Sequence, residues 1–381
     1  MRPAIVHQTG TVVSVSEPSS RSRRRQYYYS FMRDGLLIAK ALRRGWRQPF
    51  EPSELSLDRI GSITPILISS GAAGLVWRRI ELLNSPRGQP NLPLQEAHRS
   101  HQIHAAVHEL EVTDIFTRAR AYQIEPILFK GWALARLYPD VGLRPYGDID
   151  LWVRPEELEK LYRALPSGDE YSYCVEPHVS FYPQYERSFD DVMSASQLIP
   201  LNGIRVRVPC DEDHLRFICL HFLYHGAWRP LWLCDIALMV ESASSEFDWD
   251  RCLSGNPKHS DWIACVIGLA HQLLGADVTG TPVEKRARNL PGWLAPAVLK
   301  QWGDGSGMSF AENLSFSFPR RLLKPAALMR ALREHWRNPI QASVEMNAWF
   351  NESPRSPLQF GSAFLRIPEF SRFFGQEIRR T

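Results

Sequence analysis

Two acids with one residue between them, Asp148 and Asp150, stand at the start of an apolar run over 149–153. The run predicts a strand, and alternate side chains of a strand share a face. Two neighbouring carboxylates raise each other's pKa unless a cation lies between them. Hard oxygen ligands on a rigid strand suit Mg²⁺ that is bound together with substrate phosphates. Two solvated acids at a strand end would have the same spacing, so the spacing alone leaves both interpretations open.

A second group of candidate residues precedes the acids. An apolar run over 127–129 ends at Lys130 and Gly131, and a helical segment follows. A glycine between a strand and a helix allows a phosphate to approach backbone N–H groups at the helix N-terminus. Lys130 offers a point charge to a phosphate, or extends its ammonium group from a strand end into water. Arg144, in the turn before Gly147, fits either a phosphate contact or an ion pair with a nearby acid.

Together these residues resemble the glycine-then-Asp-x-Asp signature of the nucleotidyltransferase superfamily, which has a DNA polymerase β-like fold. The segment is similar to a bacterial branch with a Leu-Lys-Gly strand end, a Leu-Arg-Pro-x-Gly-Asp-x-Asp turn and a following Arg-Pro. Here these elements are Phe129-Lys130-Gly131, Leu143-Arg144-Pro145-Tyr146-Gly147-Asp148-Ile149-Asp150 and Arg154-Pro155. The resemblance continues more faintly to about residue 280 and does not extend over the first 90 residues.

The resemblance implies a role for each residue. Asp148 and Asp150 would be catalytic ligands of Mg²⁺, with two ions possible, and the substrate would be an NTP. Its phosphates would be held by Lys130, Gly131, Arg144 and Gly147. One departure stands out, because most of the superfamily has Gly-Ser or Gly-Gly where this chain has Gly131-Trp132. The missing hydroxyl leaves part of the triphosphate contact unexplained.

The superfamily usually adds a third carboxylate on an adjacent strand, and Glu176 is the matching residue here. On a strand, Glu176 and His178 would share one face. Pro177 between them lacks a backbone N–H and favours an edge strand. Asp211 and Asp213 are the competing acids, but they precede an apolar periodic run and fit a helix cap more simply.

Composition bounds the class of protein. The chain has 381 residues, 44% of them hydrophobic and 23% charged, which is typical of a globular protein with a substantial core. The six cysteines form no C-x-x-C pair, which favours reduced thiols in a cytoplasmic protein. No secretory signal is visible, and the most apolar stretch, 63–76, is too short to insert stably into a membrane.

The pattern of elements predicts an α+β fold, with a small mixed-sheet core between helical regions. We expect a disordered basic arm over 1–26, an N-terminal helical region over 27–120 and a nucleotidyltransferase core over 121–210. A helical domain over 211–290 and a C-terminal extension over 291–381 would follow. Helical spacing covers 27–47 and 51–84, with a helix start at Pro52-Ser53, and Asn202-Gly203 between apolar runs predicts a hairpin.

Three functions fit the sequence. The first is Mg²⁺-dependent transfer of an NMP, most simply AMP, to a hydroxyl or phosphate acceptor. Because the net charge is only +4, we expect a small molecule or peptide as the acceptor rather than a nucleic acid. The second is a hydrolase whose metal is held by His214, His221, His225 and Asp235. The third is a non-catalytic nucleotide-binding accessory protein of a biosynthetic cluster.

Overall fold

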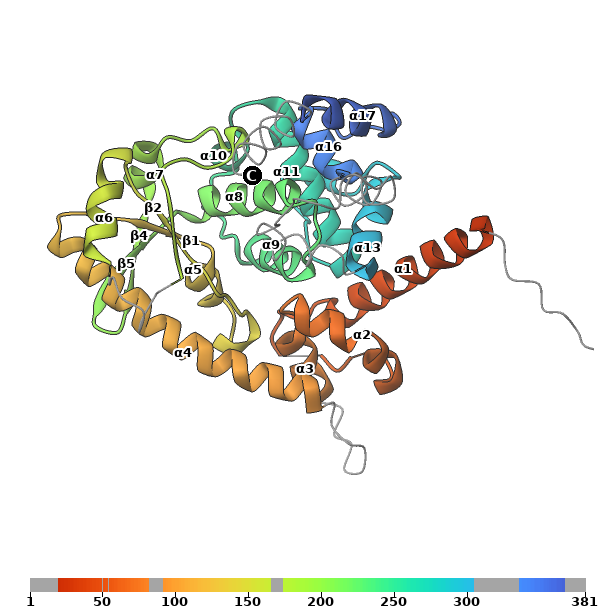
Figure 1. The fold of residues 1–381 in the computed structure, drawn as a ribbon, viewed down its shortest axis with the longest axis horizontal. Coiled ribbons are helices and arrows are strands. Elements are labelled where there is room, and N and C mark those ends of the chain that lie inside the picture. Colours follow the sequence, from red (N-terminus) through yellow and green to blue (C-terminus); the bar gives the residue numbers. More distant parts are fainter. Residues whose placement is uncertain are drawn as a thin grey trace, which may run out of the picture.

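The computed structural model describes residues 20–49, 51–53, 55–81, 92–165, 174–304 and 336–366. Its architecture is α+β, as predicted: a small sheet unit lies beside a larger body of helices (Figure 1). The long helix α4 (Leu92–Ala121) runs from the N-terminal helices to the sheet unit and lies along it.

Three strands form the central mixed sheet, in the order β1 (Ile127–Phe129), β2 (Ile149–Trp152) and β3 (Val175–His178). β1 pairs antiparallel with β2, and β2 pairs parallel with β3. The register places Asp150 opposite both Phe129 and Glu176. The proline of β3 thus lies on an edge strand of this sheet, as predicted, because an edge leaves its missing N–H without a required partner.

The predicted hairpin is confirmed. β4 (Gln197–Leu201) and β5 (Ile204–Val208) pair antiparallel, with Leu201 opposite Ile204. Asn202 and Gly203 both have positive φ, at 45° and 82°. This is the conformation of a two-residue turn that matches the twist of the flanking strands.

The two faces of the sheet are buried against different cores. Leu128, Ile149 and Leu151 pack into a cluster formed with α4, α5 (Gly131–Ala135), α6 (Leu158–Ala164) and the hairpin. Phe129 and Trp152 belong to the larger core of the helical body. Since side chains alternate along a strand, Asp150 lies on the same face as Trp152, toward the helical body.

The N-terminal helices depart from the predicted boundaries. α1 spans Ser20–Leu42, so residues 20–26, which we expected in the arm, are helical, and residues 1–19 lie outside the described residues. The predicted start at Pro52-Ser53 is wrong: the Ser53 hydroxyl accepts the N–H of Leu55 in a local turn, and α2 begins at Leu57. Gly71, with φ of 77°, separates α2 (Leu57–Ser69) from α3 (Ala73–Glu81).

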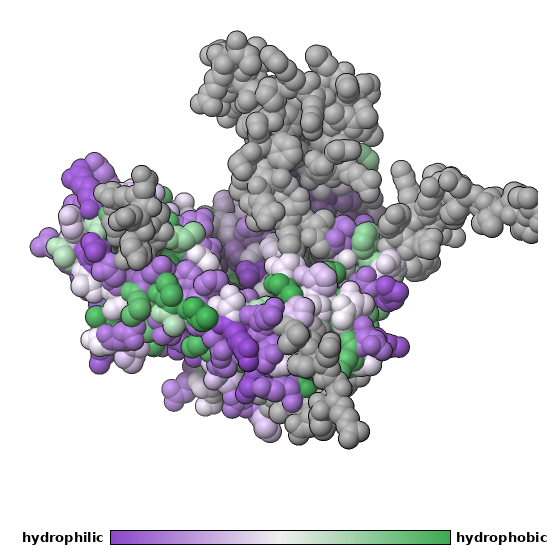
Figure 2. Space-filling view, turned by 60° about the horizontal axis from the view of Figure 1, so that its bottom comes forward, coloured by the Kyte–Doolittle hydropathy of each residue, from purple (hydrophilic) through white to green (hydrophobic). Residues whose placement is uncertain are grey.

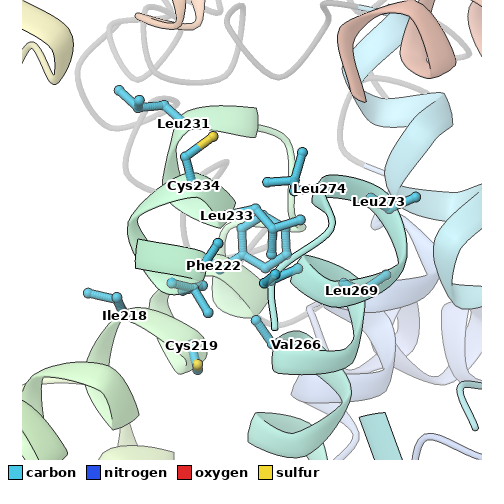
Figure 3. Packing of buried hydrophobic residues seen from close by; sticks show 14 of the residues in the cluster. Ile218, Cys219, Phe222, Leu231, Leu233, Cys234, Val266, Leu269, Leu273 and Leu274 are labelled. Atoms are coloured by element: carbon cyan, nitrogen blue, oxygen red, sulfur yellow. The ribbon is translucent and has the colours of Figure 1, made fainter. Parts of the chain in front are cut away.

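The helices after the sheet unit follow the predicted order. A short helix, α7 (Phe189–Ala195), precedes the hairpin, and the helical body continues with α8 (Asp211–Tyr224), α9 (Pro230–Ser242), α10 (Trp249–Leu253) and α11 (Pro257–Leu269), which runs into a π-helical turn over Ala270–Leu274. Figure 3 shows side chains of α8, α9 and α11 packed into one interior. This core holds the helices against the sheet face that carries Asp150.

The N-terminal helix packs against a helix from the last third of the chain. α12 (Glu284–Ala287) leads to α13 (Leu294–Asp304), and α16 (Pro339–Glu345) and α17 (Ser356–Leu365) follow. α13 packs on α1 at a crossing where Cβ atoms on Gly35 and Gly303 would collide with the opposite backbone. The helical segments that we divided into 27–120, 211–290 and 291–381 share one core cluster. The domain boundaries themselves stay a prediction.

The described residues on the face seen in Figure 2 are mainly hydrophilic. The lower side of Figure 1, turned forward in Figure 2, carries a small hydrophobic patch, and α4, which runs along this side, exposes Ile103, Val107 and Leu110. Among the residues that the structure describes, no helix combines the length and the apolar character needed to cross a bilayer.

Candidate functional site

Asp150 is the centre of the candidate site. Its side chain is fully buried, and its Oδ1 atom lies 2.8 Å from the Lys130 ammonium nitrogen and 2.9 Å from Nε2 of His178. A carboxylate can only accept hydrogen bonds, so Nε2 of His178 carries a proton and donates it to Asp150. Lys130 directly follows β1, Asp150 lies on β2 and His178 lies on β3. The site therefore depends on the register of all three strands.

Glu176 completes a cluster with metal-ligand character. Its Oε1 atom lies 3.8 Å from Nε2 of His178, which confirms that the two side chains share a face of β3. One ligand atom each from Asp150, Glu176 and His178 falls within 4.8 Å of the others, and no other such group occurs among the residues that the structure describes. Glu176 is more than half exposed, whereas Asp150 is buried, so the cluster opens from the sheet interior toward solvent.

The electrostatics of Asp150 fit a bound cation. Burial alone would raise its pKa, but the hydrogen bond from His178 and the charge of Lys130 outweigh burial and hold the pKa below its ordinary value. The acid is therefore ionised. Its Oδ2 atom is buried and has no hydrogen-bond partner among the residues that the structure describes. A buried anionic oxygen without a partner is costly, and coordination to a divalent ion would remove that cost.

Asp148, the other acid of the motif, is more exposed than Asp150. It is half-buried, directly precedes β2, and lies outside the three-residue cluster. Within the described residues it forms no hydrogen bond or ion pair. Gly147 beside it is exposed, and a Cβ there would meet no atom within 4 Å. Asp148 therefore stands at the open side of the site.

The segment after β1 has an unusual backbone. Lys130 and Gly131 have φ of 51° and 40°, a region that residues with a side chain rarely adopt. A Cβ on Gly131 would lie 3.3 Å from the backbone oxygen of Asp148, so the glycine allows these two segments to approach. Trp132 turns away into the other core, where its indole N–H donates to Glu109 at 3.2 Å. It supplies no polar group in place of the missing hydroxyl.

Arg144 is engaged elsewhere, which is the second of the two roles that the sequence left open for it. Its Nη2 atom donates to Oδ2 of Asp235 at 2.9 Å, and its Nε atom lies 3.2 Å from both carboxylate oxygens. The hydroxyl of Tyr138 donates to Oδ1 of the same acid at 2.8 Å. All three residues are buried. This pair joins the turn before β2 to α9 and leaves the guanidinium of Arg144 with a carboxylate partner.

The alternative metal set, His214, His221, His225 and Asp235, is not formed among the described residues. Asp235 accepts from Arg144, and both His221 and His225 approach the hydroxyl of Tyr182, at 2.8 and 3.1 Å. One hydroxyl proton serves one imidazole, so the other imidazole must donate to the tyrosine oxygen. The histidines form a hydrogen-bonded network between the sheet unit and α8, and the hydrolase interpretation loses its ligand set.

The competing third acid is also accounted for. Asp211 and Asp213 lie in the first turn of α8, but the predicted capping role is wrong, because Cys210 is the N-cap residue and no side chain caps the helix there. Asp213 is buried and pairs with Arg187 at 3.3 Å and with Arg251 at 2.5 Å. This pairing gives Asp213 a structural role and leaves Glu176 as the acid beside Asp150.

Comparison with known proteins identifies the family of the chain. The family model for an uncharacterised nucleotidyltransferase matches residues 58–275, which is more than half of the chain. The chain therefore belongs to this nucleotidyltransferase family, and the membership supports transfer of a nucleoside monophosphate as its general activity. The match begins in α2, earlier than the limit that we expected from the resemblance. No curated protein and no solved structure gave a match.

Sequence reasoning missed some residues of the site. His178 was visible as the second residue of an alternating pair, but its contact with Asp150 depends on the parallel register of β2 and β3. Tyr182 follows β3 by four residues and reaches two histidines of α8, at 2.8 and 3.1 Å. No spacing in the sequence signals that contact, because it joins segments about 40 residues apart.

Proposed function

We propose that the chain transfers an NMP, most simply AMP, from a Mg²⁺-bound NTP to a hydroxyl or phosphate group of an acceptor. The observation that carries this proposal is the cluster of Asp150, Glu176 and His178 within 4.8 Å, together with the unpartnered Oδ2 atom of Asp150. Membership of the family supports the general activity. The nucleotide, the metal and the acceptor are the finer parts of the proposal.

Asp150 and Asp148 would hold the metal, and Glu176 would complete its ligands. When bound, Mg²⁺ supplies charge neutralisation of the phosphates and polarises the oxygens at the reacting centre. His178 holds Oδ1 of Asp150 by a hydrogen bond, which leaves Oδ2 directed to ligation. Lys130 stabilises the ionised form of Asp150, so the acid is ready to bind a cation at neutral pH.

The transfer step follows from these positions. An acceptor oxygen attacks the α-phosphorus, the bond from that phosphorus to its bridging oxygen breaks, and pyrophosphate leaves. Glu176 is exposed and ionisable, so its carboxylate can accept the proton that the acceptor hydroxyl loses. Gly131 leaves room for a phosphate near the backbone, and Gly147 leaves the entrance open.

The modest net charge of +4 supports an uncharged or weakly charged acceptor, a small molecule or a peptide, over a nucleic acid. A protein that tracks a phosphate backbone concentrates lysine and arginine on one surface. Within the described site, Lys130 is paired with Asp150 and Arg144 with Asp235, so neither forms part of a free basic track.

The test uses an NTP labelled at the α-phosphate, with Mg²⁺ and a panel of candidate acceptors. We expect label transfer and pyrophosphate release from wild type, and loss of both without divalent metal or in Asp150→Asn. Binding of Mn²⁺ in the presence of a non-hydrolysable NTP, followed by electron paramagnetic resonance, gives a readout that needs no acceptor. An Asp150→Asn variant that binds Mn²⁺ and transfers label like wild type would refute the assignment. Nucleotide binding without any transfer across the panel would favour the accessory-protein alternative.

A further inference from the structure

Both cationic side chains of the motif are already paired with carboxylates among the described residues. Lys130 is paired with Asp150, and Arg144 is held by Asp235. The residue after Gly131 is Trp132, whose only polar group donates to Glu109. Phosphate oxygens are nevertheless best bound by charge-assisted donors, above all by a guanidinium with two parallel N–H groups. A donor from outside the recognised motif is therefore required.

Arg229, the residue before α9, has the necessary groups. It is partly buried, and within the described residues no carboxylate lies within ion-pair distance of it. Its Nε atom donates to the backbone oxygen of Ser70 at 2.9 Å, and this is its one hydrogen bond to those residues. The two Nη atoms, which form the outer side of the fork, are left without a hydrogen-bond partner there.

The charge of Arg229 is poorly compensated. Burial lowers its pKa to about 10, and the nearby charge of Arg144 acts in the same direction. The carboxylates of Asp235 and Asp148 oppose this shift. A guanidinium in this state gains more from a bound anion than one that already has a carboxylate partner.

Contacts place Arg229 beside the turn that carries the acids. A Cβ on Gly71 would lie 2.7 Å from Nη2 of Arg229 and 3.0 Å from Cγ of Pro145, so the guanidinium and the turn meet at this glycine. Pro145 is three residues before Asp148. The absence of a side chain at Gly71 makes the space that the guanidinium occupies.

On its other side, Arg229 borders the aromatic part of the site. Its guanidinium carbon lies 5.6 Å from the ring centre of Trp232, which packs at 4.5 Å against His221. His221 shares the hydroxyl of Tyr182 with His225, and the charge of Lys130 contributes to lowering the pKa of both imidazoles. Arg229 thus lies between the acid-bearing turn and the histidine network that faces Lys130.

We propose that Arg229 binds the polyphosphate of the NTP through its two Nη groups, and that it replaces the hydroxyl that the Gly131-Trp132 turn lacks. This inference rests on the proposed function. It assigns a binding role to the helical body that the Asp-x-Asp motif does not contain. The ligand class is a Mg²⁺-bound polyphosphate, recognised by charge and by the planar fork.

A structural role alone accounts for only part of this geometry. A cation at the C-terminal end of α2 is favourable, and the bond from Nε to Ser70 provides that interaction. A lysine would serve this purpose equally well. The two Nη atoms, which have no hydrogen-bond partner among the described residues, have no such explanation, and they separate the two roles experimentally.

The experiment measures binding of Mg²⁺·ATP, Mg²⁺·tripolyphosphate and adenosine to the full chain by calorimetry. The variants are Arg229→Gln, Arg229→Lys and the control Arg163→Gln, which removes an exposed arginine of α6. We expect Arg229→Gln to weaken Mg²⁺·ATP and Mg²⁺·tripolyphosphate by about 10-fold or more, with adenosine unchanged. Arg229→Lys should lose part of this affinity, because it keeps the charge but not the fork. The control should bind like wild type.

The outcomes separate the two proposals. If wild type binds neither Mg²⁺·ATP nor Mg²⁺·tripolyphosphate, the proposed function fails first. If wild type binds both ligands and the two Arg229 variants bind them as tightly as wild type does, the inference about Arg229 is overturned and the proposed function is not. An equal loss for adenosine and tripolyphosphate would indicate a structural role and would also overturn it. Thermal unfolding of each variant identifies loss of the fold, and Arg229→Lys decides the question if Arg229→Gln does not fold.

Discussion

Two buried aspartates of this protein each accept hydrogen bonds from two side chains, but the donors are distributed differently over the carboxylate oxygens. Asp150, on the sheet, accepts from Lys130 and His178, but both donors approach the same oxygen. Asp235, on α9, accepts from Arg144 and from a tyrosine hydroxyl, and these donors cover both oxygens. The first acid keeps one oxygen without a partner, whereas the second has none left over.

We propose that this difference separates a metal-binding acid from a structural one. A carboxylate whose oxygens are all satisfied gains nothing from a metal and holds two segments together. A carboxylate with a buried, unpartnered oxygen beside an exposed acid is poised to bind a cation. Counting donors on each oxygen therefore distinguishes two residues that burial and ion pairing alone would class together.

The strongest test of this distinction is Asp150→Asn. The amide keeps the shape of the side chain but loses the anionic oxygen, so we expect NMP transfer to fall on the order of 10³-fold or more. The measurement is release of pyrophosphate under saturating Mg²⁺·NTP, at equal folded protein as judged by circular dichroism. Asp190→Asn serves as the control, since Asp190 is largely exposed and pairs with Arg154 at the surface. A loss of activity in Asp190→Asn equal to that in Asp150→Asn would remove the contrast.

The matching substitution at the other acid, Asp235→Asn, should act on stability. It leaves the buried guanidinium of Arg144 without its anion, and we expect the free energy of unfolding to fall by about 3 kcal/mol. Urea denaturation measures this change. Asp150→Asn should cost less, because Lys130 is partly exposed and can turn to water. If Asp150→Asn proved the more destabilising of the two, the assignment of roles would be reversed.

Glu176→Gln tests whether the exposed acid takes part in chemistry. We expect a fall of about 10- to 100-fold in the rate of transfer, because the side chain can no longer accept a proton. Stability should stay unchanged, since Glu176 is more than half exposed. Single-turnover rates across pH give the readout, and the acidic limb of the profile should change in the variant. An unaltered rate would contradict a role for Glu176 in the reaction and would leave that role to Asp150 and Asp148.

The smallest expected effect concerns His214 in the helical body, a side chain that burial keeps neutral. Burial, helped by the charges of Arg136 and Arg144, lowers the pKa of His214 to about 3. Between that value and the ordinary value of 6.5, the unfolded chain binds a proton that the folded chain does not. Stability therefore falls as pH falls through this window, by about 1.4 kcal/mol per pH unit from this residue.

Urea denaturation of wild type and His214→Gln at pH 7, 6 and 5 isolates this contribution. The free energy of unfolding of wild type should decrease more steeply than that of the variant, because other histidines titrate equally in both proteins. Parallel curves would show that His214 protonates in the folded chain as easily as in the unfolded one.

Much of the site was predictable because its elements are local. The apolar runs at 127–129 and 197–208 gave β1 and the hairpin, since turn residues and alternation act over a few residues. Glu176 and His178 could be placed on one face for the same reason. The start of α2 was missed because the hydroxyl of Ser53 accepts a nearby N–H in a turn, a use that competes with helix capping.

What the sequence determined by itself is the motif: the acids, the glycine and the lysine within about 20 residues, on elements whose periodicity is short. What only the tertiary structure decided is how those groups are paired. Arg144 finds Asp235 across 91 residues, and Arg229 reaches Ser70 across 159. The physical reason is that a pattern of residues records local backbone preference, whereas ion pairing depends on which charges the packed core brings within a few ångströms. We therefore propose different roles for two arginines of equal formal charge, because the fold pairs Arg144 with a carboxylate and, among the described residues, pairs Arg229 with none.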